Sequence, residues 1–254
     1  MTNRLRKQNE SNRPHRIGPS LFTLVTLLFG LASTDLTARP YDGKRSTDQP
    51  TDRPEVASRF SAGKDETPSF QRHVSPLFGR LGCNGRSCHG SFQGQGGFQL
   101  SLFGYDFQAD HLALLAEGSG RVDLEDVDES LILSKPIDAD GHGGGKRFEK
   151  GSWEYNLLRN WIAGGAKSVA QPERLSKLVV EPSMIDFSKT PQQQLQVIAR
   201  WADGSEEDVT ALARFQTKDP ALAEVSERGL VSGQSAGDTH IIVSYDNAVV
   251  PVEV

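Results

Sequence analysis

Several features that commonly identify a function are missing from this chain. Its net charge is -5 and its basic residues form no stripe beyond the extreme N-terminus, which argues against a nucleic-acid-binding protein. The glycines Gly94-x-Gly96-Gly97 are too few for a dinucleotide-binding loop and follow no predicted strand. Neither a Ser-His-Asp pattern nor a nucleophile elbow is present. We therefore expect a carrier or binding module rather than an enzyme, unless a catalytic region lies outside this chain.

The chain also lacks a hydrophobic run long enough to cross a membrane. Its longest run, Leu21–Ala32, has twelve residues, whereas a membrane helix needs about 20. Arginines and a lysine precede this run, and small residues at Ala32 and Ala38 suit a signal peptidase. Residues 1–38 are therefore predicted to be a signal peptide, and the protein to be exported to the periplasm or cell surface. The alternative is an uncleaved N-terminal membrane anchor.

Two other absences refine the export prediction. No cysteine lies near the cleavage point, which argues against a lipoprotein, and no Arg-Arg pair precedes the hydrophobic run, which favours the general secretion route. Residues 39–66 then contain few apolar side chains and many Asp, Pro, Ser, Arg and Lys. Such a composition cannot bury enough surface to offset the entropy of ordering, so a disordered linker is predicted there.

The two cysteines of the chain stand beside a histidine, in Cys83-Asn-Gly-Arg-Ser-Cys88-His89. Two cysteines followed at once by histidine are typical of a covalently attached haem c, whose iron the histidine ligates. The usual spacing has two residues between the cysteines, and here there are four. Asn84-Gly85 favours a bulge that could absorb the extra pair. A Cys83–Cys88 disulfide and a zinc site that recruits His142 are the alternatives.

Methionine, the common second axial ligand of such a haem, is scarce. Met1 is removed with the signal peptide, and Met184 falls in a region of predicted strands. His142 is followed by three glycines, which would let the backbone approach a haem closely. We therefore predict that His89 and His142 ligate the iron. An exposed His142 with water or an open position on the iron is the alternative.

Periodicity separates a helical region from a strand-rich one. Residues 67–170 carry apolar side chains at helical spacing between glycine-rich loops, and their core looks thin unless a haem fills it. From residue 171 the period becomes two, with six or seven short strands that suggest an all-β sandwich without an inter-sheet disulfide. The predicted helices are 70–81, which Pro76 makes short or kinked, 110–117, 128–133 ending before Pro136, and one from the cap Ser152 to Gly164.

Single side chains outside these patterns receive simple interpretations. We expect His73 to be solvated on the polar side of its helix. A group of four aromatic residues is expected in the core, and a group of three cations either neutralises haem propionates or faces solvent. The aromatic residues are Phe98, Phe103, Trp153 and Trp161, and the cations are Lys146, Arg147 and Lys150.

Two segments resemble known bacterial families. Residues 70–167 resemble the cytochrome c-like domain of large exported planctomycete proteins, through Cys88-His89-Gly90, Gly97-Phe98-x-Leu100-Ser101-Leu102-x-Gly104-Tyr105-Asp106 and Trp161-Ile162-x-x-Gly165-Ala166. Residues 175–254 resemble bacterial Ig-like domains of group 2, through Trp201-x-Asp203-Gly204-Ser205 and Gly229-Leu230-Val231. These resemblances imply a multidomain protein, with a mainly α cytochrome c-like domain at 67–170 followed by an all-β Ig-like sandwich at 171–254.

The expected function is electron transfer through a covalent haem held by Cys83, Cys88, His89 and His142. A six-coordinate haem carries electrons and does not activate substrates. The Ig-like region would act as a spacer or in adhesion, and the partners would be a redox protein or a component of the cell envelope, with no nucleic acid. The alternative is a non-redox surface-binding or scaffold protein with a Cys83–Cys88 disulfide, or the N-terminal part of a larger envelope protein.

Overall fold

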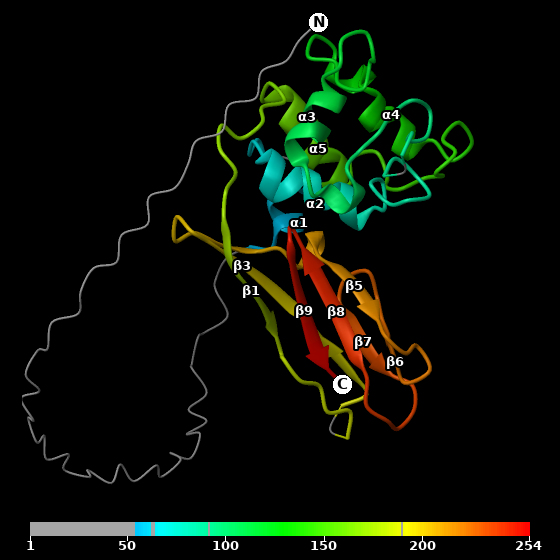
Figure 1. The fold of residues 1–254 in the computed structure, drawn as a ribbon, viewed down its shortest axis with the longest axis vertical. Helices are drawn as coiled ribbons and strands as arrows, with labels where there is room; N and C mark the ends of the chain where they lie inside the picture. The colour runs from blue at the N-terminus through cyan, green and yellow to red at the C-terminus, as the bar shows by residue number, and fades with distance from the viewer. Residues whose placement is uncertain (1–53, 62–63, 91, 189) are drawn as a thin grey trace, which may run out of the picture. The chain divides into compact units, whose positions relative to one another are not determined.

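The computed structural model describes residues 54–254 except 62–63, 91 and 189. The predicted signal peptide and most of the predicted linker lie outside these residues. Residues 48–254 form one compact unit, with a helical part followed by a strand-rich part (Figure 1). Within the described part of the chain, no helix is long and apolar enough to cross a membrane.

The helical segments are short and are separated by long loops. The longest α-helix has 11 residues and the shortest has 4. The α-helices are α1 (Val56–Arg59), α2 (Ser75–Arg80), α3 (Phe107–Leu114), α4 (Leu131–Ile137) and α5 (Trp153–Ala163), and single turns are η1 (Phe70–Val74), η2 (Leu102–Gly104), η3 (Val127–Glu129) and η4 (Thr210–Leu212).

Helix α5 confirms the sequence prediction at both ends. The Ser152 hydroxyl accepts a hydrogen bond from the Tyr155 N–H, which satisfies one of the free N–H groups of the first turn. Gly164 ends the helix, and Leu157, Leu158 and Trp161 are buried on one face. This face anchors the core of the helical part.

The run predicted to be one short or kinked helix is divided into two elements just before Pro76. The wide π-helical turn η1 passes into α2, with the proline in the first turn of α2, where its missing N–H costs nothing. The predicted end of a helix before Pro136 is wrong, because α4 continues to Ile137 with the proline in its last turn. Residues 54–60 also depart from the predicted linker, since they contain α1 and fully bury Val56 and Phe60.

The strands lie in the region of predicted alternation after residue 171, and their ladders are antiparallel. They form three sheets, with strand orders β1-β3-β4, β2-β7-β6 and β5-β8-β9. Their bounds are β1 Leu175–Glu181, β2 Gln192–Gln194, β3 Gln196–Trp201, β4 Glu206–Asp208, β5 Arg214–Thr217, β6 Ala223–Val225, β7 Leu230–Gly233, β8 His240–Tyr245 and β9 Ala248–Glu253.

The predicted fold class is wrong in both parts. The first part is not mainly α, because its helices are short and many glycines with positive φ hold the loops between residues 82 and 151. The second part is not an Ig-like sandwich, because its strands are divided among three small three-stranded sheets. The three-residue strand β2 pairs with β7 instead of extending a larger sheet, and this pairing between distant segments is invisible in the periodicity.

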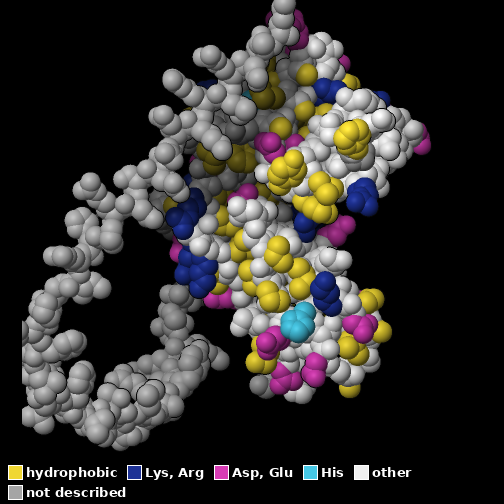
Figure 2. Space-filling model, viewed as in Figure 1, with side chains coloured by type: hydrophobic (Ala, Val, Ile, Leu, Met, Phe, Trp, Pro, Cys, Tyr) yellow, Lys and Arg dark blue, Asp and Glu magenta, His cyan; other side chains and the backbone are white. Residues whose placement is uncertain are grey.

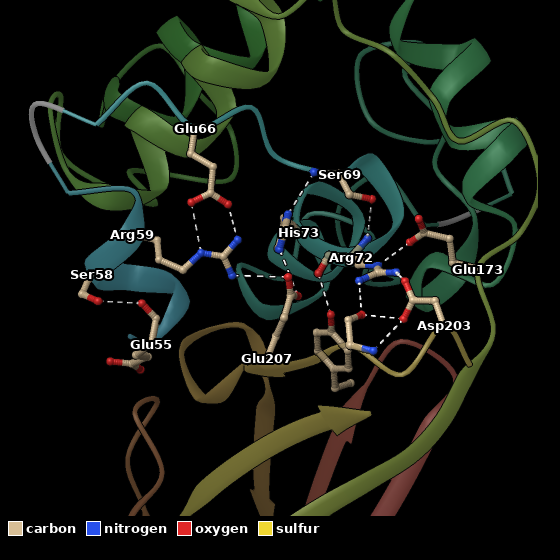
Figure 3. Close-up of polar contacts among 12 residues, drawn as sticks. Glu55, Ser58, Arg59, Glu66, Ser69, Arg72, His73, Glu173, Asp203 and Glu207 are labelled. Atoms are coloured by element: carbon tan, nitrogen blue, oxygen red, sulfur yellow. Dashed lines mark hydrogen bonds and ion pairs between the residues drawn. The ribbon is translucent and has the colours of Figure 1, made fainter. Parts of the chain in front are cut away.

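Charged side chains join the helical part to the strand-rich part (Figure 3). Arg72 of η1 pairs with Glu173 at 2.5 Å and with Asp203 at 2.8 Å, and its guanidinium lies 4.5 Å from the ring centroid of Trp201. The buried Tyr245 hydroxyl donates to the Arg72 carbonyl oxygen at 2.6 Å. On the face shown in Figure 2, charges of both signs are interspersed among exposed hydrophobic side chains of both parts.

A second group at this junction centres on Glu207 of β4. Its carboxylate accepts from Nε2 of His73 at 3.2 Å and pairs with Arg59 at 3.3 Å, and Arg59 also pairs with Glu66. Nδ1 of His73 accepts the Ser69 N–H at 2.9 Å, so Nε2 carries the proton. His73 is 4% exposed, and the predicted solvated position is therefore wrong: the turn η1 directs it inward.

We expect Glu207→Gln to lower the free energy of unfolding at pH 7 by about 2–4 kcal/mol, because it leaves the half-buried Arg59 without one of its carboxylate partners. Burial raises the pKa of Glu207, but His73 and Arg59 outweigh it and hold the pKa below 4.5. The stabilisation is therefore complete above pH 4.5 and is lost as the pH falls through the lowered pKa. Urea unfolding at several pH values measures it.

Glu227→Gln is the matched control, since Glu227 is 93% exposed and meets Arg80 only at 3.9 Å. This variant should change the stability by less than about 0.5 kcal/mol. Equal stability losses in the two variants would contradict the role assigned to Glu207.

Candidate functional site

All four residues predicted to hold a cofactor line one cavity in the helical part. The cavity has a volume of about 570 Å³, within the range of about 300–1,000 Å³ common for cofactor sites. Its lining comes from the Cys83–His89 loop, the segment around Phe98, helix α4, the loop at residues 141–148, and α5. The apolar side chains of the lining are Phe78, Leu81, Phe98, Leu100, Leu131, Ile132, Pro136, Phe148 and Leu158.

Backbone hydrogen bonds explain how the wide cysteine spacing closes. The His89 N–H donates to the Cys83 carbonyl oxygen at 2.9 Å, which brings the two ends of the loop together. The Cys88 and Gly90 N–H groups both donate to the Gly85 carbonyl oxygen at 3.0 Å. The loop is therefore a compact nested turn that places both cysteines and the histidine on the wall of the cavity.

The bulge in this loop lies later than predicted. Asn84 is 1% exposed and points inward, whereas Arg86 and Ser87 are exposed and take up the extra length. The Asn84 carbonyl oxygen accepts the Phe103 N–H at 3.3 Å. It also packs so closely on Gly90 that a Cβ there would lie 2.0 Å from the oxygen. Only glycine therefore fits at position 90, directly after His89.

His89 is held with one nitrogen directed at backbone oxygens. Its Nδ1 lies 3.1 Å from the carbonyl oxygens of both Gln95 and Phe98, so Nδ1 carries a proton and Nε2 keeps its lone pair. Burial lowers the pKa of His89, and His142 lowers it further, against the two backbone hydrogen bonds. The neutral ring is the form that ligates metals.

His142 is held in the same way from the opposite loop. Its Nδ1 lies 2.9 Å from the Gly145 carbonyl oxygen, while the Gly145 N–H donates to the His142 carbonyl oxygen at 2.7 Å. A Cβ at Gly144 would lie 2.9 Å from the imidazole. The glycines therefore let the ring fold back on its own turn, and Nε2 is again left without a partner among the described residues.

The two imidazoles lie near each other in the lining of the cavity, with their planes nearly parallel. Their ring centroids are 6.4 Å apart and their planes differ by 15°. Both rings line the cavity and both have Nδ1 bound to backbone oxygens. Anchoring one imidazole nitrogen in this way orients the other and is typical of metal-ligating histidines.

The charged side chains of the lining are all cations. Arg121 donates to the carbonyl oxygens of Ala113 and Gly97 and lies over Phe98, and Lys135 donates to that of Gly141. The sequence around Arg121 and Lys135 forms no motif that indicates a place in the cavity. Of the three predicted cations, Arg147 lines the cavity, whereas Lys146 pairs with Glu149 at 2.6 Å.

Both cysteines are free thiols in the structure. Burial raises the pKa of Cys83 to about 11, so its thiol stays protonated at neutral pH. Arg147 lies with Nη2 3.9 Å from Sγ of Cys88. Among the residues that the structure describes, no three His, Cys, Asp or Glu side chains are grouped so that they could hold a bare metal ion.

The cavity can therefore enclose a largely apolar group that carries negative charge, next to two imidazoles and two thiols. Its walls are apolar, its cations suit negative charge, and its two free Nε2 atoms suit a metal carried by that group. No protein-family model matches this chain, and no curated protein matches it either.

Proposed function

We propose that this protein carries a covalently attached haem and transfers electrons. Cys83 and Cys88 would hold the porphyrin through thioethers, and His89 and His142 would ligate the iron. The observation that carries the proposal is the pair of imidazoles, 6.4 Å apart, in an apolar cavity that both cysteines line.

The spacing of the imidazoles supports ligation of one metal ion between them. Metal–imidazole bonds are about 2 Å long, and each nitrogen lies about 1 Å from its ring centre, so two imidazoles on one metal have centroids about 6 Å apart. The observed 6.4 Å agrees with this distance. The hydrogen bonds from Nδ1 of His89 and His142 to backbone oxygens would orient both rings and leave Nε2 as the atom that binds iron.

The rest of the lining also fits a haem. Haem is flat and apolar and carries two propionates, so it needs apolar walls with cations at one edge. The cavity supplies Arg121, Lys135 and Arg147 without an aspartate or glutamate in the described lining. Phe98 packs 4.7 Å from the His89 ring and helps to exclude water from it.

The role of the chain's own residues follows from this arrangement. Two histidine ligands leave no open coordination position, so the haem would supply one-electron chemistry and the protein would exclude substrates from the iron. The walls formed by Phe78, Leu100 and Leu158 keep the surroundings of the haem apolar and exclude water. Little water then has to reorient when an electron arrives or leaves, so the free-energy cost of electron transfer is lower.

We further propose export to the periplasm or cell surface. The apolar run of residues 21–32 supports export, and covalent haem also requires it, because this haem is attached outside the bacterial cytoplasm. A redox protein or a component of the cell envelope would be the partner. The second candidate is a scaffold protein with a Cys83–Cys88 disulfide. It is favoured by the single observation that both thiols line the same cavity.

His142→Ala is expected to convert a low-spin haem spectrum into a high-spin one, because the iron loses one of its two strong imidazole ligands. Absorption spectra of the oxidised protein, produced together with a haem-attachment system, measure this change. His240→Ala is the control, since His240 is exposed on β8 and far from the cavity lining. An unchanged spectrum in His142→Ala would refute this ligand assignment.

A further inference from the structure

A second cavity of about 520 Å³ lies outside the proposed haem site. It is a groove between the loop that holds η2 and the turn that joins β8 to β9. Arg214 of β5 forms part of its floor, and Phe103, Tyr105 and Val249 form apolar walls. Three of these side chains are largely open to solvent: Phe103 is 56% exposed, Tyr105 81% and Val249 64%.

Arg214 is a cation without a charged partner. Its guanidinium makes no hydrogen bond or ion pair with the described residues, and burial alone lowers its pKa. The guanidinium carbon lies 4.8 Å from the ring centroid of Phe103. A half-buried cation that is left unpaired costs free energy, and a bound anion would remove this cost.

Phe103 is held in an unusual conformation beside this cation. It was expected in the core, but its ring is exposed and its φ is 59°, in the left-handed region that bulky side chains avoid. Its N–H donates to the Asn84 carbonyl oxygen at 3.3 Å, which helps to hold the backbone there. Strained residues of this kind gather at ligand sites.

We propose that this groove binds a small organic carboxylate, with the carboxylate group paired to Arg214 and its ring stacked on Phe103. A planar carboxylate matches the fork of a single guanidinium. Phosphate or sulfate fits less well, because Asp246 and Glu173 also line the groove and would repel a second negative charge. The carboxylate could belong to a sugar acid or to an aromatic acid, since both carry a ring that can stack on an aromatic face.

Calorimetric titration of the full chain tests the proposal with defined probes. Benzoate and galacturonate carry both a ring and a carboxylate, acetate lacks the ring, and benzamide and galactose lack the charge. At least one ring carboxylate should bind about tenfold more tightly than acetate and than its neutral counterpart. If benzoate binds more tightly, the ligand is an aromatic acid, and if galacturonate binds more tightly, it is a sugar acid. Equal binding of the neutral counterpart, or no binding of either ring carboxylate up to about 10 mM, would overturn the proposal.

Two variants separate binding from folding. Arg214→Gln should weaken the binding about tenfold, whereas Arg228→Gln removes an exposed charge outside the groove and should leave it unchanged. Phe103→Gly accepts the positive φ, so the fold should be kept while the stacking partner is lost and the affinity falls. Unchanged affinity in Arg214→Gln would refute the site. The titration does not depend on haem, so the two proposals can fail separately.

Discussion

Replacing Cys83 and Cys88 together by serine is expected to give a folded protein that carries no covalent haem. Both thiols line the cavity and neither forms a disulfide in the structure, so the double variant removes both points of attachment and no cross-link. The side chains are only partly buried, and serine is close to cysteine in size. Haem staining of a denaturing gel, with circular dichroism as a check of folding, measures the effect.

The single variants Cys83→Ser and Cys88→Ser provide the matched controls. Each keeps one thiol in the same cavity, so each should keep haem through a single thioether, in lower yield than the unchanged chain. If the protein were instead a disulfide-bonded scaffold, all four proteins would be free of stain and the double variant would lose stability in oxidising buffer by about 2–4 kcal/mol. That pattern would contradict the haem proposal.

Replacing Gly90 by alanine should disrupt the loop that carries the cysteines and His89. The added Cβ would lie 2.0 Å from the Asn84 carbonyl oxygen and 2.7 Å from its carbon, and both are backbone atoms that cannot rotate away. The loop would have to open, which would break the bond from Gly90 N–H to the Gly85 carbonyl oxygen. We expect a loss of about 3 kcal/mol or more in the free energy of unfolding.

Gly143→Ala tests whether the effect is specific to this close contact. Gly143 also lines the cavity, but a Cβ there meets nothing within 4 Å, and no positive φ is required. Its stability should change by less than about 1 kcal/mol. Chemical unfolding gives both values, and the yield of haem-bound protein should fall only in Gly90→Ala. A stable, haem-bearing Gly90→Ala protein would show that the loop differs from the one described here.

Local patterns in the sequence indicated the four residues of the candidate site, whose role in holding a cofactor stays a prediction. The Cys83–His89 motif and the glycines after His142 indicated the four residues without any knowledge of the fold, and all four line one cavity. Local chemistry explains why these residues lie together: a histidine next to a cysteine stays next to it in any fold, and glycines permit the tight turn that His142 needs.

The parts that depend on distant contacts could not be predicted. Alternation identified a strand-rich region after residue 171, but the division into three sheets depends on pairings such as β2 with β7. The prediction that His73 is solvated was wrong because its partner Glu207 is 134 residues away in the sequence. The prediction that Phe103 lies in the core was wrong because its exposure follows from a left-handed backbone conformation, which residue propensities do not predict.

The intact mass of the mature protein, measured after denaturation, is the most direct test of the haem proposal. The protein should be produced with a haem-attachment system and measured both before and after reduction. We predict a mass equal to the mature chain plus one haem, retained in acid and organic solvent. A mass equal to the chain alone, or to the chain less two hydrogens before reduction, would contradict covalent haem at Cys83 and Cys88.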